Sequence, residues 1–424
     1  MAKTFTPKDA HTVMNLLLKQ ATGQNAVAVV DSSSFTSAGE LVLATGMENV
    51  FNALNIVLNR LVVASRPYNA KMRIVSSNEV GAYSNRARKI SFYSRYALPD
   101  GSHNTDLYTN LAEGYTSGDN GGSSTKSQWE QHQPMPLEMN FGGTNVWQYC
   151  ITNYEDQIKL ALRDDAEFAK FVAGYLQEHA NDIEQSTEGF YRMTLLNRMA
   201  MTYDMSSDMP GAVIDLTSAF NSFYNTQYTG AQLRSTYLKE FLAFMTATIK
   251  EVSDYMEERT CKYHWSVPKT VGGETFHILR HTPKDRQKLV LYSPLFRKAE
   301  AMVLPEIFNS QYLSIDNYEP VSFWQSDYTD LDDANRPKIN VTPAIIEADS
   351  TDPAYGTQIK GAAVVLDYVV GFLFDTDAVL AEMQLDRVDT TPVEARKHYR
   401  NTWATFAKNT ISDPTENAVL FYMS

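Results

Sequence analysis

A glycine-rich stretch beside a Lys-Ser pair is the first feature of this sequence that could carry chemistry. Residues 114–125 read GYTSGDNGGSST and are followed by Lys126 and Ser127. A phosphate-binding loop of the GxxxxGK[ST] type wraps backbone amides around the phosphates while its lysine reaches them. Counting back from Lys126, the two required glycines fall on Asn120 and Thr125. The stretch therefore does not predict a phosphate site, and its glycines suit the tip of a long excursion of the chain.

Histidines, cysteines and carboxylates form no familiar catalytic or metal-binding pattern either. His277 and His281 are four residues apart, but HILRH lacks the glutamate of HExxH and reads as a strand, where that spacing is ~13 Å. Cys261 and His264 form one Cys/His pair with no second pair to complete a zinc site. The acidic run at 327–337 lacks the spacing of a calcium loop, and no GxSxG elbow is present. The sequence predicts no catalytic residue, no metal and no cofactor, and so a protein that is not an enzyme.

The composition is that of a folded, acidic protein. Of its 424 residues 43% are hydrophobic and 21% charged, which is enough apolar material for a sizeable core. A net charge of −13 argues against tight binding of phosphate backbones, because such binding needs clustered lysine and arginine. The two cysteines, Cys150 and Cys261, indicate a reducing compartment. Neither a secretory signal nor a run of ~18 apolar residues is visible, so we expect no membrane span.

Apolar periodicity and turn residues predict the elements of the first third of the chain. Residues 6–23 read as an amphipathic helix that starts at Thr6-Pro7 and stops at Gly23. A Ser/Thr-rich loop and a second helix over 46–65 follow. Residues 68–150 read as a long β-excursion, with two extended runs and the glycine-rich stretch as its tip.

The strongest helical pattern covers residues 151–205. It comprises a short helical piece at 153–162 and a long helix capped by Asp164 or Asp165. We expect its methionines to fill the core; they are Met193, Met199 and Met201. A further helix is predicted over 231–259, and strands over 274–281, 287–296, 362–374 and 417–424. Because helices and strands do not alternate regularly, the fold class is α+β.

The segment ITNYEDQIKLALRDDAEFAKFVAGYLQEHANDIE, at 151–184, resembles the major capsid proteins of tailed bacteriophages. In that family, which has the Hong Kong 97-type fold, a short helix, an Asp-containing break and a long spine helix follow a β-excursion called the E-loop. Residues 280–309 and 395–424 are similar to the strands and helix of the short-tailed podovirus branch, including small picovirus-like phages.

The resemblance implies five consecutive parts. They are an N-terminal arm (1–67), the E-loop (68–150), a peripheral domain with the spine helix (151–285), an axial domain (286–390) and the last peripheral and axial strands (391–424).

The resemblance also implies a function. Proteins of this family self-assemble as hexamers and pentamers into an icosahedral head that encloses double-stranded DNA. The implied partners are further copies of the chain, a portal, possibly a scaffold protein, and packaged DNA in weak contact. The implied location is the virion, assembled in the cytoplasm of the host bacterium. Near the E-loop tip, Tyr115, Lys126 and Trp129 are the predicted inter-subunit contacts.

Two other interpretations stay open. One is another phage structural or scaffold-associated protein with a similar order of elements. The other is a hydrolase that uses scattered carboxylates outside any known motif.

Overall fold

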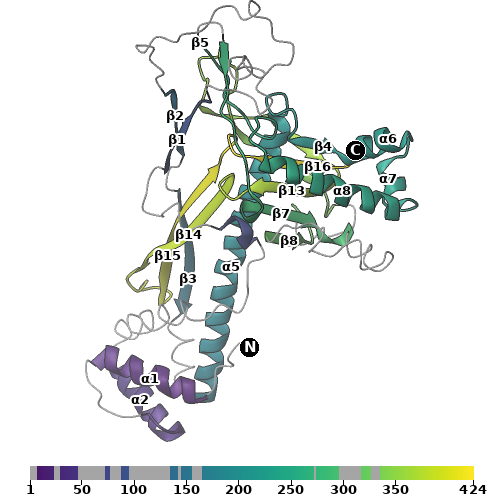
Figure 1. Cartoon of the computed structure of the whole chain (residues 1–424). Helices are drawn as coiled ribbons and strands as arrows, with labels where there is room; N and C mark the ends of the chain where they lie inside the picture. Colours follow the sequence, from purple (N-terminus) through teal and green to yellow (C-terminus); the bar gives the residue numbers. More distant parts are fainter. Residues whose placement is uncertain are drawn as a thin grey trace, which may run out of the picture.

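The computed structural model describes residues 7–22, 29–45, 72–76, 87–94, 134–141, 145–154, 165–271, 274–295, 317–325 and 335–424. Helices and strands follow one another irregularly along these residues, which confirms the predicted α+β class. Figure 1 shows an elongated molecule in which one long helix joins a pair of helices at one end to the sheets at the other.

The long helix is α5 (Asp165–Asp204). It has 40 residues and is therefore about 60 Å long. It starts at the Asp-Asp break that the sequence indicated, and no proline interrupts it. At the end of α5 that lies away from the sheets, α1 (Pro7–Thr22) and α2 (Ser32–Ala44) pack against it and against each other (Figure 1). The helix is thus the axis on which the rest of the described chain is arranged.

A three-stranded antiparallel sheet lies along α5 (Figure 1). Its central strand is β15 (Tyr399–Ser412), with β14 (Val379–Thr390) on one side and β3 (Asn145–Tyr154) on the other. The described pairing of β15 with β3 runs from Tyr399 opposite Tyr154 to Lys408 opposite Asn145.

A five-stranded mixed sheet holds the main hydrophobic core. Its order is β4 (Val213–Asp215), β16 (Ala418–Tyr422), β13 (Val369–Asp375), β7 (Gln287–Tyr292) and β8 (Asn317–Val321). The middle strand, β13, is buried along its whole length, as its continuous apolar run predicts for a strand covered on both faces. The helices at this end of the molecule are α6 (Leu216–Tyr224), α7 (Gly230–Leu233) and α8 (Leu238–Glu257). Apolar side chains of α8 at helical spacing enter the same core as those of β13.

Short two-stranded ribbons complete the described chain, all of them antiparallel. They are β1 (Ala87–Phe92) with β2 (Pro136–Phe141), β5 (Lys269–Val271) with β6 (Glu274–Phe276), β9 (Ile339–Val341) with β12 (Val364–Leu366), and β10 (Ala344–Ile346) with β11 (Gln358–Lys360). Single 3-10 turns lie at Arg73–Val75 and Lys284–Arg286.

The predicted Ser/Thr-rich loop after α1 is a helix, α2, so that prediction was wrong. Asp31 caps it, because its carboxylate accepts the backbone N–H of Ser34 at 2.8 Å. Phe35, Ala38 and Val42 then fall on one buried face. The polar residues between them hid this period. The helix predicted over 46–65 lies outside the described residues.

Three further predictions need correction. Asn153 and Tyr154, predicted as the start of a short helix, end strand β3, and the rest of that segment lies outside the described residues. The helix predicted over 231–259 is divided, since α7 ends at Leu233 and α8 begins at Leu238. Met193 is 59% exposed on α5 and does not fill the core, whereas the predicted burial of Met199 and Met201 is confirmed.

We expect the stability of the protein to be sensitive to one methyl group added at Gly371 in β13. An added Cβ would lie 2.4 Å from the Leu291 side chain and 3.0 Å from the Val290 carbonyl oxygen. We expect Gly371→Ala to lower the free energy of unfolding by about 1–3 kcal/mol through overpacking. The matched control is Gly189→Ala on α5, where an added Cβ meets nothing within 4 Å; it should stabilise the protein by roughly 0.5–1 kcal/mol. Urea unfolding of both variants measures the difference, and equal effects would contradict this account of β13.

Candidate functional site

The contact residues predicted at the tip of the excursion, Tyr115, Lys126 and Trp129, lie outside the described residues, as does the glycine-rich stretch. The described part of the excursion is the β1–β2 ribbon, which pairs antiparallel from Ala87–Phe141 to Phe92–Pro136. The side chains of this ribbon, and of the residues that it contacts, are therefore the described part of the predicted excursion.

Side chains alternate along β1 between solvent and the body of the molecule. Ile90 and Phe92 point outward and are 53% and 56% exposed. Lys89 and Ser91 point inward, and Ser91 is buried. One face of the ribbon thus rests on its own chain, while the other presents apolar side chains that the described residues do not cover.

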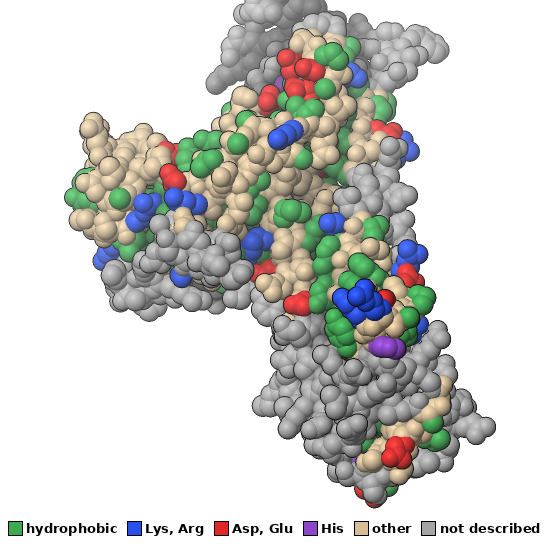
Figure 2. All heavy atoms as spheres, turned by 180° about the vertical axis from the view of Figure 1, so that it is seen from behind, with side chains coloured by type: hydrophobic (Ala, Val, Ile, Leu, Met, Phe, Trp, Pro, Cys, Tyr) green, Lys and Arg blue, Asp and Glu red, His purple; other side chains and the backbone are tan. Residues whose placement is uncertain are grey.

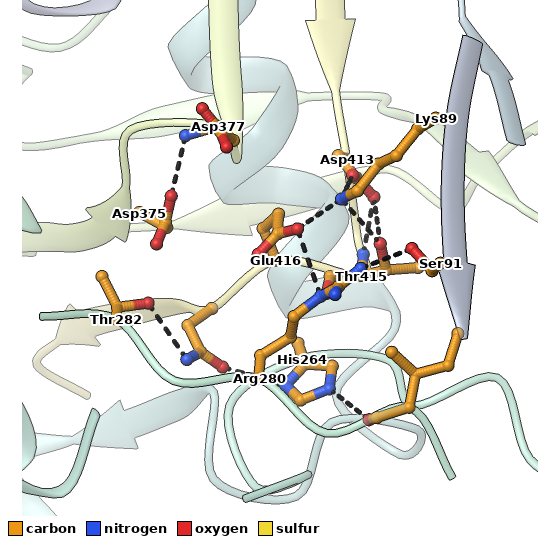
Figure 3. Close-up of polar contacts among 12 residues, drawn as sticks. Lys89, Ser91, His264, Arg280, Thr282, Asp375, Asp377, Asp413, Thr415 and Glu416 are labelled. Carbon is orange, nitrogen blue, oxygen red and sulfur yellow. Dashed lines mark hydrogen bonds and ion pairs between the residues drawn. The ribbon is translucent and has the colours of Figure 1, made fainter. Parts of the chain in front are cut away.

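Lys89 joins the ribbon to the turn between β15 and β16 (Figure 3). Its ammonium group forms ion pairs with the carboxylates of Asp413 and Glu416 and donates to the Thr415 hydroxyl at 3.2 Å. Asp413 also accepts the backbone N–H and the hydroxyl of Thr415, at 2.8 and 2.7 Å. These hydrogen bonds from its own turn hold the Asp413 carboxylate in the position in which it pairs with Lys89.

Two arginines complete this ion cluster, which consists of Lys89, Arg198, Arg280, Asp413 and Glu416. Arg280 lies 3.1 Å from a carboxylate oxygen of Glu416 and donates to the Ser91 hydroxyl at 2.6 Å (Figure 3). Arg198 of α5 is fully buried and donates to the backbone carbonyl of Glu416 at 3.2 Å. The ribbon, the long helix and the β15–β16 turn therefore meet at one point.

The two carboxylates respond differently to this environment. Burial would raise the pKa of Asp413, but the charge of Lys89 and the bonds from Lys89 and Thr415 outweigh it, so the pKa is lowered. For Glu416, burial and the nearby charge of Asp413 outweigh Lys89 and Arg280, so the pKa is raised. Burial lowers the pKa of Arg198 to about 10, which still leaves it charged at neutral pH.

Buried polar residues extend the cluster behind the β15–β16 turn. His264 is fully buried, with Nε2 2.8 Å from the Ile278 carbonyl and Nδ1 2.9 Å from the Asn417 side chain (Figure 3). Burial lowers the pKa of His264 to about 4 despite these hydrogen bonds, so the ring is neutral above that pH. Asn417 in turn donates to the Thr282 hydroxyl at 3.1 Å. This histidine is a hydrogen-bonded core residue and not half of a Cys/His metal pair.

The other predicted histidines also have structural surroundings. His277 lies beside Ser266, with its Nδ1 2.9 Å from the hydroxyl oxygen, and its backbone carbonyl accepts the N–H of Ser94 at 3.0 Å. His281 is exposed. Within the described part of the chain no group of three His, Cys, Asp or Glu side chains is placed to hold a metal ion.

Chemically, the ion cluster is suited to holding segments together. Both of its carboxylates are engaged by cations from other elements. The sequence pointed to Lys126 and missed Lys89, because the partners of Lys89 lie 324 and 327 positions later in the chain. Only the strand alternation of β1, which turns Lys89 inward, could have singled it out.

A second feature is an aromatic tip formed by α6 and α8. Phe223 and Tyr224 are 72% and 48% exposed, and their rings contact Phe244. Figure 2 shows hydrophobic side chains exposed at this end of the molecule, on the left. Aromatic side chains offer large contact area at low entropic cost, so this surface suits association with another protein.

Of the helices in the described residues, none combines the length and apolarity needed to span a membrane.

Comparisons with known proteins give similarity only at the level of three-dimensional structure. No protein-family model matches the chain, and no curated protein matches it. Similar solved structures include the capsid of Staphylococcus phage Andhra, at 11% identity and a TM-score of 0.46, covering 85% of this chain and 84% of that one. The mature capsid of bacteriophage PhiM1 has 10% identity and a TM-score of 0.38, covering 84% and 88%. The capsid of Myoviridae phage XM1 has 9% identity and a TM-score of 0.34, covering 82% and 89%. These three similar structures are phage capsid structures.

Proposed function

We propose that this chain is a phage major capsid protein that self-assembles as hexamers and pentamers into an icosahedral head enclosing double-stranded DNA. The observation that carries the proposal is the arrangement around α5. A β-ribbon precedes this long helix in the chain, a three-stranded sheet lies along it, and a five-stranded sheet with its helices follows. That is the order of elements which the resemblance to the capsid family implies.

Surface features of the described residues support an assembly role. The outer face of the β1–β2 ribbon exposes Ile90 and Phe92, and the aromatic tip exposes Phe223. Such apolar surfaces are expected where a partner covers them. The net charge of −13 suits a shell wall that holds packaged DNA only weakly. The protein then acts by association and not by catalysis.

The proposal includes the division of the chain into domains, its branch of the family, its location and its contact residues. The chain divides at residues 67, 150, 285 and 390 into arm, E-loop, peripheral domain and axial domain, with 391–424 returning to both domains. It belongs to the short-tailed podovirus or picovirus-like branch, works in the virion after assembly in the host cytoplasm, and meets a portal and a scaffold protein. Tyr115, Lys126 and Trp129 contact the neighbouring subunit.

Assembly can be tested by removing the tip of the excursion. We expect the full chain to form rings or shells in gel filtration and negative-stain electron microscopy. Deleting 114–127 should leave the circular dichroism spectrum and melting temperature unchanged and reduce assembled material strongly. The physical reason is that each lost contact of about 1.4 kcal/mol lowers an association constant about tenfold, and a shell repeats each contact many times.

The control replaces 114–127 with a Gly/Ser linker of equal length, which separates side-chain contacts from chain length. A stable, compact monomer of the full chain at high concentration would sink the capsid proposal and leave the other phage structural role. A hydrolase would instead turn over a substrate as a particle that does not assemble.

A further inference from the structure

The turn between β14 and β15, residues 391–398, is a basic tip on an acidic protein. Arg396, Lys397 and His398 follow one another in the chain, and all three are exposed. Neither Arg396 nor Lys397 has a carboxylate partner for its side chain within the described residues. The protein as a whole has a net charge of −13. Cations that the fold itself does not neutralise are available to an acidic partner.

Hydrogen bonds hold the basic tip in one shape. The Glu394 N–H donates to the Tyr399 carbonyl at 2.9 Å, and the His398 N–H donates to the Glu394 carbonyl at 2.9 Å. The carboxylate of Glu394 accepts the backbone N–H of Lys397 at 2.6 Å, so this acidic side chain is directed at its own turn. The two cations are therefore presented on a defined turn, which lowers the entropic cost of ordering them in a contact.

The turn between β10 and β11, residues 347–357, has the opposite charge. This acidic turn contains Glu347, Asp349 and Asp352 and no lysine or arginine. Within the described part of the chain none of the three carboxylates pairs with a cation; each accepts a backbone N–H of its own turn. Hydrogen bonds from the side chain and backbone of Thr351 lower the pKa of Asp349, so this carboxylate is charged at neutral pH.

The basic tip and the acidic turn lie too far apart to meet within one molecule. The basic tip is at the Tyr399 end of β15, and the acidic turn is near the other end, where Tyr355 and Ser412 line one cavity of about 650 Å³. The 14 residues of β15 span about 45 Å. Figure 2 shows Asp and Glu side chains gathered near one end of the molecule, and a group of Lys and Arg beside a histidine farther along it. Each chain thus carries a positive and a negative surface at separate places.

We propose that the basic tip of one chain binds the acidic turn of a second copy of this chain. Complementary charge selects this partner, because the copy offers carboxylates that its own described cations do not neutralise. Duplex DNA fits less well, since its affinity grows with the number of phosphates neutralised and the tip offers two unpaired cations. The contact joins two different surfaces, so it repeats from copy to copy and closes into a ring when the rotation between copies closes. The choice of a second copy rests on the proposed function, which requires such rings.

Charge reversal tests the contact by complementation. The tip variant carries Arg396→Glu and Lys397→Glu, and the turn variant carries Asp349→Lys and Asp352→Lys. In either variant alone, tip and turn have like charge, so we expect self-association at low ionic strength to weaken about tenfold or more. An equal mixture should recover association, because the acidic tip of one variant meets the basic turn of the other and the remaining tip and turn keep their native charges. Sedimentation velocity measures all three samples.

Two further variants serve as controls. Lys239→Glu with Lys250→Glu makes the same change in net charge at two exposed lysines of α8 and should leave association unchanged. Asp349→Asn with Asp352→Asn keeps side-chain acceptors in the acidic turn; it should weaken association about fivefold and replaces the turn variant if circular dichroism shows that the lysines prevent folding. A mixture that recovers nothing, or a loss no larger than that of the α8 control, would overturn the proposal. So would a tip variant that loses affinity for duplex DNA while its self-association is unchanged.

Carbodiimide crosslinking of the wild-type protein provides a second readout, because it joins a lysine amine to a carboxylate in contact with it. In an equal mixture of isotope-labelled and unlabelled protein, we expect mixed-isotope peptides that link Lys397 to Asp349 or Asp352. The absence of such peptides contradicts the proposal. Electron microscopy of the same samples keeps the two ideas apart: crosslinks without rings or shells defeat the proposed function alone, whereas shells without these crosslinks defeat the contact alone.

Discussion

Replacing Asp413 with asparagine should lower the free energy of unfolding at neutral pH by about 3–5 kcal/mol, because it removes one partner of a buried ion pair. Asp413 is 1% exposed and pairs with Lys89, and its charge partly offsets the burial that lowers the pKa of Arg198. Its lowered pKa means that the folded protein favours the charged form. Chemical denaturation of the two proteins at pH 7 measures the loss.

Glu416→Gln is the matched control, and its expected effect is much smaller. The raised pKa of Glu416 means that the folded protein disfavours its charge, so the neutral amide removes a penalty while keeping an acceptor for Lys89 and Arg280. We expect a change within about 1 kcal/mol in either direction. A loss as large as that of Asp413→Asn would show that the Glu416 charge is needed, contrary to this account.

The pH dependence of the two variants has opposite sign. The contribution of Asp413 is present above its ordinary pKa of 3.8 and is lost as pH falls through its lower folded value. The gap between wild type and Asp413→Asn should therefore close in acid. For Glu416 the contribution is present below its ordinary pKa of 4.5 and is lost as pH rises through its higher folded value. Glu416→Gln should accordingly compare best with wild type near neutrality.

Trp324→Ala should cost about 3–5 kcal/mol, as expected for removing a fully buried tryptophan. Trp324 follows β8, and its indole N–H donates to the Val369 carbonyl at 2.9 Å at the start of β13. Its backbone N–H donates to the Arg336 carbonyl at 3.0 Å. One side chain thus fills the core and fixes the loop after β8 to the middle strand of the five-stranded sheet.

Trp324→Phe separates these two roles, since it keeps most of the ring but loses the indole donor. We expect a cost of about 1–3 kcal/mol for the unpaired Val369 carbonyl and the smaller ring. Thermal unfolding of both variants gives the comparison. If phenylalanine costs as much as alanine, the hydrogen bond and not the cavity sets the stability of this loop.

Local sequence signals were sufficient to predict those elements whose ends and buried faces depend on neighbouring residues. Pro7 starts α1, the Asp-Asp break starts α5, and the second half of the strand predicted over 362–374 is the fully buried β13. Each of these depends on capping, helix-breaking or periodicity within one segment. The prediction of a single strand over 362–374 was wrong, because Val364–Leu366 form a separate strand, β12, that pairs with β9. The α2 prediction failed although its cap is local, because the described apolar side chains of its buried face, which are Phe35, Ala38 and Val42, stand among polar residues.

The sequence by itself determined the helices α1 and α5 and the buried strand β13, and it showed that no familiar catalytic motif unites its polar residues. The tertiary structure alone decided which charges meet, because Lys89 and Asp413 are brought together across 324 positions and no periodic pattern links residues so far apart. It also decided the register of β15 against β3, in which Lys408 lies opposite Asn145, because register is set when segments pack against each other and not by the preference of either strand.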